Sequence, residues 1–350
     1  MSDASTVPAR SFVTGASGLL GSRIVTELLA GGGQVTALVR DTDRARRLLP
    51  DHPDLVLVSG DVTEPESYLP YLGGNDVVFH TAAYFREYYQ PGFDLELLRR
   101  TNVTAVENLL LASAGAGVPT VVHTSSTGVL GGGSPEHPAD EDDKPTGDWQ
   151  RNAYRASKVD AEEVVHTCVR RTGQRVPLIL PGWMWGPGDA GPTAAGRLFL
   201  AIAKGELAAV PAAGNHLVDA RDVAIACVRA AAEGESGRRY VVAGTWHALP
   251  DIARLITDEV GVPARRTVPV PAALTFATVL ETIAKLRGQA PIATRTGVKV
   301  LVEGHRKRYT SARAEKELGI GFRPLAETIA DEAAWYRTRG MLPAVPAHVG

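Results

Sequence analysis

The sequence predicts an α/β fold in which a doubly wound parallel sheet is followed by a smaller, mostly helical C-terminal lobe. Short apolar runs without polar alternation recur through the first half of the chain, and a helical pattern separates each from the next. Strands that helices bury on both faces have this signature. A glycine-rich turn joins the first apolar run to the first helical segment, as in a Rossmann sheet. After about Gly182 the pattern loosens, which marks the start of the lobe.

Each element of the sheet half follows from its own periodicity. The first helix places Leu20, Ile24 and Leu28 in one i, i+4 row. The expected strands are Ser11–Thr14, Gln34–Val39, Leu55–Ser59, Val77–His80, Thr120–Thr124 and Val176–Leu180, and the main helices are Leu19–Ala30, Leu95–Ala114 and Tyr154–Arg171.

The second half contains mainly helices and one strand that returns to the sheet. We expect residues 1–181, with a return at 215–245, to form the Rossmann domain, and residues 182–214 and 246–350 to form the lobe. The expected helices are Pro192–Lys204, Ala220–Ala232, Pro250–Val260, Pro271–Arg287 and Leu325–Arg339, and the strand is Tyr240–Ala243.

Composition excludes several classes of protein. The 350 residues include 37 Lys and Arg against 39 Asp and Glu, so the basic surface of a nucleic-acid binder is not expected. Cys168 and Cys227 form no CxxC pair, which argues against a metal site or a disulfide framework. No signal peptide and no apolar run of about 18 residues is visible, so we expect a cytoplasmic chain that is not integral to a membrane.

The glycine-rich turn carries Gly15, Gly18 and Gly21 at intervals of three. The first glycine allows a sharp turn, the second allows backbone to approach a pyrophosphate, and the third allows the helix to pack against the strand. The N–H groups at the helix start favour phosphate. A strand–turn–helix context predicts dinucleotide binding, whereas a tight structural turn is the simpler alternative.

The end of the second strand distinguishes NADP from NAD. Arg40 ends the strand and Arg44 follows one turn later, and two cations favour the 2′-phosphate of NADP. Asp41 could bond the ribose of NAD or could cap the helix Thr42–Leu49. We therefore expect NADP, with NAD as the other possibility; a solvated Arg40 is the alternative without function.

The segment Tyr154-Arg155-Ala156-Ser157-Lys158 is the second chemical signal. Tyr and Lys four residues apart share one helix face. A tyrosine hydroxyl has a pKa near 10, and a nearby ammonium is expected to lower that pKa. Tyr154 could then exchange a proton with a carbonyl oxygen as hydride reaches the carbon. Ser126, just past the fifth strand, could orient that oxygen, because ligands bind at strand carboxyl ends.

Other residues near the strand ends fit the same site. Asp61 could accept from an adenine amino group, and Ala82 and Ala83 are small enough for a cofactor to pass close to backbone. Asn102, before the fifth strand, could relay protons or bond backbone, and both roles stay open. The acidic, Pro/Gly-rich segment 131–150 could be a surface loop or a flap near the site.

These residues and motifs resemble the extended short-chain dehydrogenase/reductases, a group within the NAD-dependent epimerase/dehydratase family, and among them the dihydroflavonol-reductase-like branch. The resemblance covers roughly residues 10–340 and rests on TGASGLLG (14–21), GDV (60–62), HTAA (80–83), TNV (101–103), TSS (124–126), YRASK (154–158), GPGD (186–189), VDARDVA (218–224) and AEKELGIGFRP (314–324).

The resemblance implies a catalytic role for Ser126, Tyr154 and Lys158. It implies that the nicotinamide meets the end of the sixth strand. The cofactor contacts that it implies are Gly15, Ser17, Gly18, Leu19, Leu20, Arg40, Asp61, Val62, Ala82, Ala83, Thr124, Tyr154, Lys158, Pro181 and Trp183.

The chain departs from sugar-nucleotide epimerases after the sixth strand. Leu180 stands where they usually carry Arg, and Gly182-Trp183-Met184-Trp185 replaces a more polar stretch. Aromatic walls with few charges suit an apolar or aromatic carbonyl substrate, although the same residues could merely join the two lobes. The candidate substrate contacts are Tyr84, Phe85, Ser126, Trp149, Trp183, Met184, Trp185, Phe199 and His216.

The sequence therefore favours an NADP-dependent carbonyl reductase or alcohol dehydrogenase that acts on a small molecule. An epimerase or dehydratase that recycles its cofactor is the second hypothesis, and a cofactor-sensing protein without catalysis is a remote third. The resemblance implies a homodimer through Leu95–Ala114 and Tyr154–Arg171. The apolar helix Pro271–Arg287 could cover the pocket, contact a partner or a membrane surface, or pack in a core.

Overall fold

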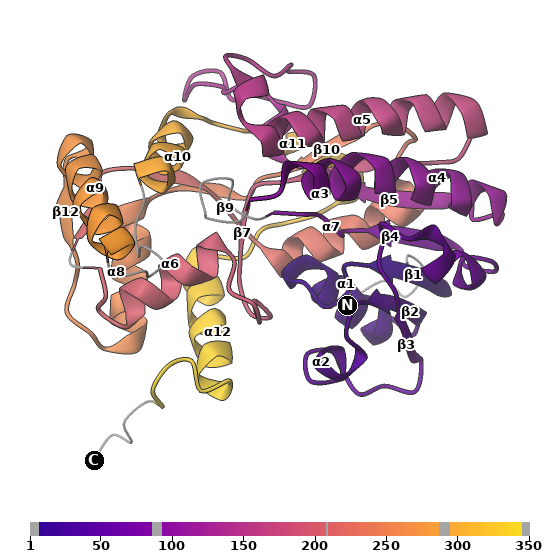
Figure 1. Cartoon of the computed structure of the whole chain (residues 1–350), viewed down its shortest axis with the longest axis horizontal. Coiled ribbons are helices and arrows are strands. Elements are labelled where there is room, and N and C mark those ends of the chain that lie inside the picture. The colour runs from indigo at the N-terminus through magenta and orange to yellow at the C-terminus, as the bar shows by residue number, and fades with distance from the viewer. Residues whose placement is uncertain (1–6, 86–92, 208, 287–294, 345–350) are drawn as a thin grey trace.

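The computed structural model describes residues 7–85, 93–207, 209–286 and 295–344. Within them, seven strands form a parallel sheet in the order β10-β6-β5-β4-β1-β2-β3, which confirms the predicted doubly wound fold (Figure 1). The strand order reverses beside β1, where ligands bind in such sheets. The strands are β1 (Arg10–Thr14), β2 (Gln34–Val39), β3 (Leu55–Ser59), β4 (Val77–His80), β5 (Thr120–Thr124), β6 (Leu178–Pro181) and β10 (Arg239–Val242).

Helices cover both faces of the sheet. On one face α1 (Leu19–Ala30) and α7 (Ala220–Glu233) pack over one apolar cluster, and on the other α4 (Ala105–Gly115) and α5 (Ala153–Thr172) pack over a second. Successive strand residues alternate between the two clusters, with Val13 in the first and Phe12 in the second. This alternation explains why the strands read as unbroken apolar runs.

The helix predicted at Leu95–Ala114 is interrupted. It consists of α3 (Leu95–Arg99), a π-helical turn η3 (Arg100–Thr104) and α4. The hydrophobic pattern could not show this, because a π turn adds a single residue to the helix. Its one buried residue is Asn102, and π turns often mark functional sites.

The lobe contains more strands than the sequence suggested. A three-stranded sheet joins β7 (Trp183–Trp185), β9 (Gly214–Asp219) and β11 (Thr245–Ala248), and β8 (Ala209–Pro211) pairs with β12 (Arg266–Val268). These strands have three to six residues, too few for a clear period. The helices of the lobe are α6 (Ala194–Ala203), α8 (Leu249–Val260), α9 (Val270–Leu286), α10 (Arg295–Arg306) and α12 (Leu325–Thr338).

Two segments pack with the other part of the molecule from the one expected from the sequence. Residues 215–219 belong to β9 in the small sheet, so the return to the large sheet starts at α7. Conversely, α11 (Ala312–Leu318) buries Ala314 and Leu318 in the cluster beneath α1 and α7. The pattern of one element does not reveal which of two sheets it joins.

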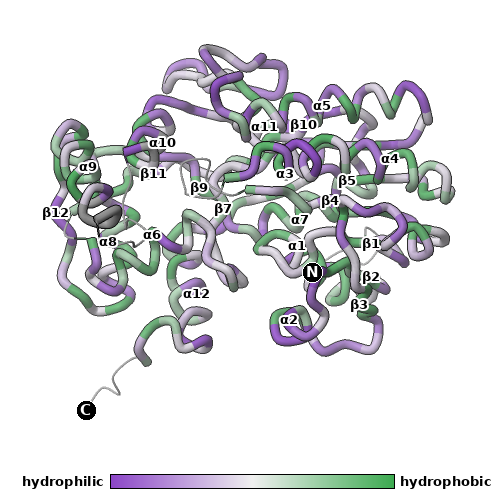
Figure 2. The backbone as a smooth tube through the Cα atoms, viewed as in Figure 1, coloured by the Kyte–Doolittle hydropathy of each residue, from purple (hydrophilic) through white to green (hydrophobic). Residues whose placement is uncertain are grey.

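Hydropathy along the backbone follows this architecture. The tube in Figure 2 is hydrophobic along the sheet strands and mainly hydrophilic in the segment that precedes α5. Because the strands are parallel, their carboxyl ends form a single edge of the sheet. Polar segments and the lobe surround this edge.

Candidate functional site

The predicted cofactor residues converge on one edge because every strand of the large sheet points the same way. They follow the carboxyl ends of the strands in turn: Gly15–Leu20 after β1, Arg40 after β2, Asp61 and Val62 after β3, Ala82 and Ala83 after β4, Thr124 at the end of β5, and Pro181 and Trp183 around the end of β6.

The glycine turn has the close backbone approach that the spacing predicts. Gly15 has a φ of 67°, and a Cβ there would lie 2.7 Å from the backbone nitrogen of Ala82. A Cβ on Gly21 would collide with the Gly15 carbonyl, so α1 packs directly on the turn. Gly18 caps α1 without a side-chain hydrogen bond and is exposed. The first N–H groups of α1 can therefore bind an anion, which fits the pyrophosphate of a dinucleotide.

Asp41 caps α2 (Thr42–Arg46), as one of the two hypotheses proposed. One of its carboxylate oxygens accepts a hydrogen bond of 2.9 Å from the backbone nitrogen of Arg44. The preceding Arg40 is exposed at the strand end. This leaves an exposed cation directly after β2.

Asp61 is held in one orientation at the end of β3. Its Oδ1 accepts hydrogen bonds of 2.8 Å from both the backbone nitrogen and the hydroxyl of Thr63. The other carboxylate oxygen could accept a hydrogen bond from an adenine amino group. Val62 beside it is buried and Ala82 is partly buried.

Lys158 lies beneath the carboxyl end of β5. Asn152 caps α5 by accepting from the nitrogen of Arg155, so Tyr154 and Lys158 fall in the first two turns of the helix. The ammonium donates a 2.9 Å hydrogen bond to the carbonyl of Thr124. Burial lowers the pKa of Lys158 to about 8, and the charge of Glu162 acts against this.

Tyr154 and Ser126 are hydrogen-bonded through their side chains. Ser126 also caps a short 3₁₀ turn by accepting from Gly128, 3.0 Å away. Burial raises the pKa of Tyr154 to about 12, and the bond to Ser126 lowers it only in part. The expectation of a tyrosine pKa lowered by Lys158 is therefore wrong for this structure, because desolvation of the phenol outweighs the other effects.

The side chain of Asn102 connects two segments through hydrogen bonds. Its side chain accepts from the backbone nitrogen of Tyr84 at 2.7 Å, donates to the carbonyl of Tyr84 at 3.1 Å and donates to the hydroxyl of Ser157 at 3.1 Å. The side chain is 2% exposed. These bonds fix the segment after β4 against α5, which favours the structural role over proton relay.

Three of the aromatic side chains predicted for the substrate are not fully buried, and one of them contacts Tyr154. The ring of Phe85 is 54% exposed and meets Tyr154 edge-on, with 4.6 Å between the ring centroids. Trp183 is partly buried and contacts Trp185 at 5.0 Å. Trp149 begins a 3₁₀ turn just before α5 and is partly buried. Phe85, Trp183 and Trp149 thus remain available to a ligand.

The structure places other predicted substrate residues in packed interiors. Phe199 and Trp185 are fully buried in the lobe core, with their ring centroids 6.3 Å apart. Met184 packs on the cluster beneath α1. His216 accepts a 3.1 Å hydrogen bond from the nitrogen of Tyr309, and burial lowers its pKa to about 4. Phe199 and Trp185 therefore pack within the lobe, and Met184 joins the lobe to the sheet domain.

Comparison with known proteins decides the family. The sequence model of the NAD-dependent epimerase/dehydratase family matches residues 11–243. The chain belongs to this family. The predicted resemblance to extended short-chain dehydrogenase/reductases is thereby confirmed.

Two relatives of this epimerase/dehydratase family member align over nearly its whole length. "Putative dihydroflavonol 4-reductase" of Synechocystis sp. is 31% identical over 334 residues, which cover 94% of this chain and 95% of that protein. "Sterol demethylase protein B" of Methylococcus capsulatus is 30% identical over 339 residues, which cover 95% and 99%. The crystal structure of gox2253 has a TM-score of 0.78 and 30% identity, with 95% of this chain and 99% of that chain covered.

Sequence reasoning missed several residues that shape the site of this family member. Arg155 donates 2.6 Å and 3.2 Å hydrogen bonds to the carbonyls of Gly128 and Leu130, and so holds the turn that follows Ser126. The hydroxyl of Tyr309 bonds Thr127. The position of Arg155 beside Tyr154 was a usable signal, whereas nothing local connects Tyr309 with a turn 182 residues earlier.

Two kinds of feature, metal sites and membrane-spanning helices, were sought in the described part of the chain. There, no group of three or more His, Cys, Asp or Glu side chains is arranged to hold a metal ion. No helix among the same residues has the length and apolar character needed to cross a membrane.

Proposed function

We propose that the chain is an NADP(H)-dependent reductase that acts on a ketone or aldehyde group of a largely apolar or aromatic small molecule. The observation that carries the proposal is the hydrogen bond between Ser126 and Tyr154, with Lys158 one turn further along α5. The three side chains lie at the sheet edge that also presents the glycine turn.

The side chains can perform the proton transfer of a carbonyl reduction. NADPH would supply the hydride to the carbonyl carbon. Tyr154 is a neutral phenol because its pKa is about 12, so it can donate its proton to the carbonyl oxygen. Ser126 orients that oxygen, and the Lys158 ammonium holds the ribose and stabilises the phenolate that remains until solvent returns a proton.

One basic residue and one acidic residue after β2 support the preference for NADP. Arg40 is exposed at the end of β2, and Asp41, the residue that could have favoured NAD, is used to cap α2. A guanidinium binds phosphate through charge-assisted hydrogen bonds.

Aromatic side chains and the names of relatives support the substrate class. Phe85 and Trp183 offer ring surface beside Tyr154 and the end of β6. One relative bears the name of a dihydroflavonol reductase and another that of a sterol demethylase protein. Both names denote ring systems with much apolar surface, which aromatic side chains bind well.

The direct test is consumption of NADPH and NADH with a panel of aromatic and aliphatic ketones and aldehydes. We expect NADPH oxidation with at least one ring ketone and slower oxidation of NADH. If purified protein retains cofactor yet oxidises none with the whole panel, the reductase proposal fails and an epimerase or dehydratase becomes the better hypothesis. A protein that binds added NADPH but turns over neither kind of substrate would be a cofactor sensor.

We also propose a cytoplasmic homodimer. The helices α4 and α5 lie side by side on one outer face, and they are the pair through which the family resemblance implies dimerisation (Figure 1). Sedimentation velocity at micromolar concentration should give the mass of two 37.1 kDa chains, and a monomer would contradict the proposal.

A further inference from the structure

Glu162 is a buried carboxylate one helical turn after Lys158. Its side chain is 3% exposed. One oxygen accepts a 2.5 Å hydrogen bond from the hydroxyl of Ser125, and the other lies 2.6 Å from a guanidinium nitrogen of Arg239. Burial raises the pKa of Glu162, whereas Arg239, the hydrogen bond from Ser125 and the nearby His166 act against this and favour the ionised carboxylate.

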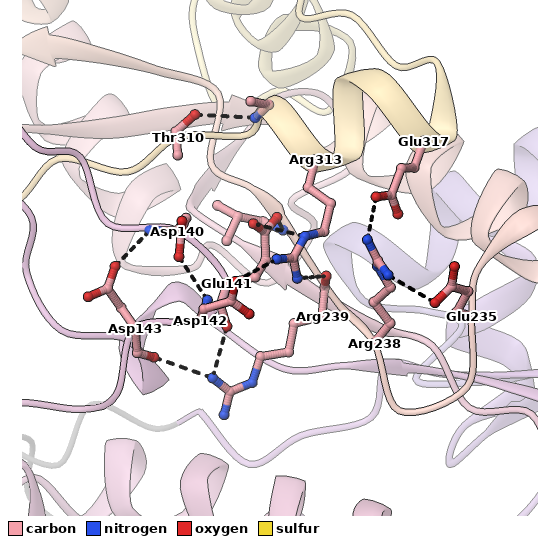
Figure 3. A network of polar contacts seen from close by, with 12 residues as sticks. Asp140, Glu141, Asp142, Asp143, Glu235, Arg238, Arg239, Thr310, Arg313 and Glu317 are labelled. Carbon is pink, nitrogen blue, oxygen red and sulfur yellow. Dashed lines mark hydrogen bonds and ion pairs between the residues drawn. The ribbon is translucent and has the colours of Figure 1, made fainter.

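Arg239 links this carboxylate to the acidic segment Asp140–Asp143. It lies on β10, and its NH1 donates to the carbonyls of Glu141 at 3.3 Å and Asp143 at 3.4 Å (Figure 3). One guanidinium therefore contacts α5 on one side and the acidic segment on the other.

The acidic segment is itself fixed along the edge strand. Glu141 accepts a 2.7 Å hydrogen bond from the backbone nitrogen of Val241 on β10, which is an edge strand of the sheet in the described part of the chain. Arg313 from α11 pairs with Asp142 at 3.0 Å and with Glu141 at 3.6 Å. These contacts cover the open edge of the sheet and order the segment that leads to Tyr154.

Among the residues that the structure describes, the other groups around Lys158 carry no compensating charge. His80 on β4 and His123 on β5 are buried with their ring centroids 5.4 Å apart. Burial and the charge of Lys158 lower the pKa of both, to about 3 for His80 and well below the ordinary value for His123, so both are neutral near pH 7. Thr124 offers a carbonyl. The negative charge that acts on Lys158 comes from Glu162.

We propose that Glu162 is a positioning residue for Lys158, and that Ser125 and Arg239 hold it in place so that the ammonium stays charged under the site. The inference deepens the proposed function, because a charged lysine is what the ribose and the tyrosine require. It also gives the acidic segment a role: through Arg239, the segment 140–143 supports the carboxylate that supports the lysine.

The test is a pH titration of Lys158 in the protein without cofactor or substrate. The chain has seven lysines, so NMR of protein with isotope-labelled lysine side chains can resolve them, and Lys158→Arg assigns the signal. Glu162→Gln keeps the shape of the side chain and removes its charge. Loss of an opposite charge one helical turn away on α5 should lower the pKa of Lys158 by roughly one or more.

The matched control is Arg238→Gln. Arg238 neighbours Arg239 but pairs with other carboxylates, Glu235 at 2.9 Å and Glu317 at 2.5 Å (Figure 3). The control should leave the Lys158 titration unchanged. An unchanged titration in folded Glu162→Gln overturns the proposal, and so does an equal fall in both variants.

A second variant covers the case in which Glu162→Gln does not fold. Glu162→Gln combined with Arg239→Met removes both members of the ion pair, so neither charge is left buried alone. The pKa of Lys158 should still fall, and an unchanged pKa would overturn the proposal. Because the titration needs no turnover, its result is independent of whether the reductase assay succeeds.

Once a substrate is known, activity supplies a further readout. A group that must be protonated loses its effect as pH rises through its pKa. The alkaline limb of kcat should therefore move to lower pH in Glu162→Gln, while KM changes little. A uniform loss of kcat at every pH would indicate a structural role and contradict positioning.

Discussion

The glycine turn after β1 and the aromatic residues after β6 face the same edge of the sheet, but they are held there differently. The turn is built from backbone, and its glycines are required by contacts within a few residues or with the residues that follow β4, the strand paired with β1. The aromatic residues belong to segments that long-range packing arranges, and Trp185 and Trp183, two residues apart, end with different exposure. Local spacing thus predicts the cofactor side well, whereas the substrate side depends on tertiary contacts.

The largest expected effect concerns the residue that lies between these regions. Tyr154→Phe removes the hydroxyl that bonds Ser126 and should reduce kcat roughly 100- to 10,000-fold, because proton transfer is lost. NADPH affinity, measured by fluorescence titration, should stay within about threefold of wild type. Tyr71→Phe, at an exposed position in the 3₁₀ turn Leu69–Tyr71, is the control and should keep full activity. Equal turnover in Tyr154→Phe would remove this residue from the mechanism.

Substitutions of Phe199 and Phe85 distinguish a role in core packing from a role in substrate contact. Phe199→Ala should lower the free energy of unfolding by about 3–5 kcal/mol, because the ring is fully buried in the lobe core. Phe85→Ala should change stability by less than about 0.5 kcal/mol and raise KM for a ring ketone. Chemical denaturation and steady-state kinetics measure the two effects. If Phe199→Ala kept its stability and changed KM, Phe199 would be a substrate contact and its assignment to the lobe core would be contradicted.

The glycine turn can be tested against a glycine of similar backbone angle. Gly15→Ala places a methyl group against the nitrogen of Ala82 and should weaken NADPH binding more than tenfold, roughly 1.4 kcal/mol or more. Gly32 has a φ of 81° with no atom within 4 Å of an added Cβ. Gly32→Ala should therefore cost about 1 kcal/mol of stability and leave NADPH affinity unchanged. Equal affinity losses in both would mean that backbone strain, rather than close approach, explains the turn.

The smallest expected effect is on cofactor choice. Arg40→Ala should weaken NADPH about tenfold, the value of a charge-assisted hydrogen bond, and leave NADH affinity nearly unchanged. Arg46→Ala on the neighbouring helix, where Arg46 pairs with Asp43 at 2.8 Å, is the control. Equal losses for the two cofactors would show that Arg40 does not bind the 2′-phosphate.

The sequence could predict the large sheet and most of its edge, because each strand and the turn after it lie together in the chain. Gly15, Asp61 and Tyr154 needed only their neighbours to be recognised. The sequence alone could not predict the π turn at Asn102, the short strands of the lobe or the hydrogen bond between Tyr309 and Thr127. These features depend on contacts between distant segments. The pKa of Tyr154 was also misjudged, because burial is a tertiary property.

The most direct test of the central claim follows a labelled hydride. Protein is incubated with NADPH that carries deuterium at the transferable position and with a ketone found in the panel assay, and the products are examined by mass spectrometry. The account predicts one deuterium on the carbinol carbon of the product for each NADPH oxidised, and none with Tyr154→Phe over the same time. Product formed without net loss of NADPH and without deuterium would contradict it, and would mean that the cofactor is recycled within the site.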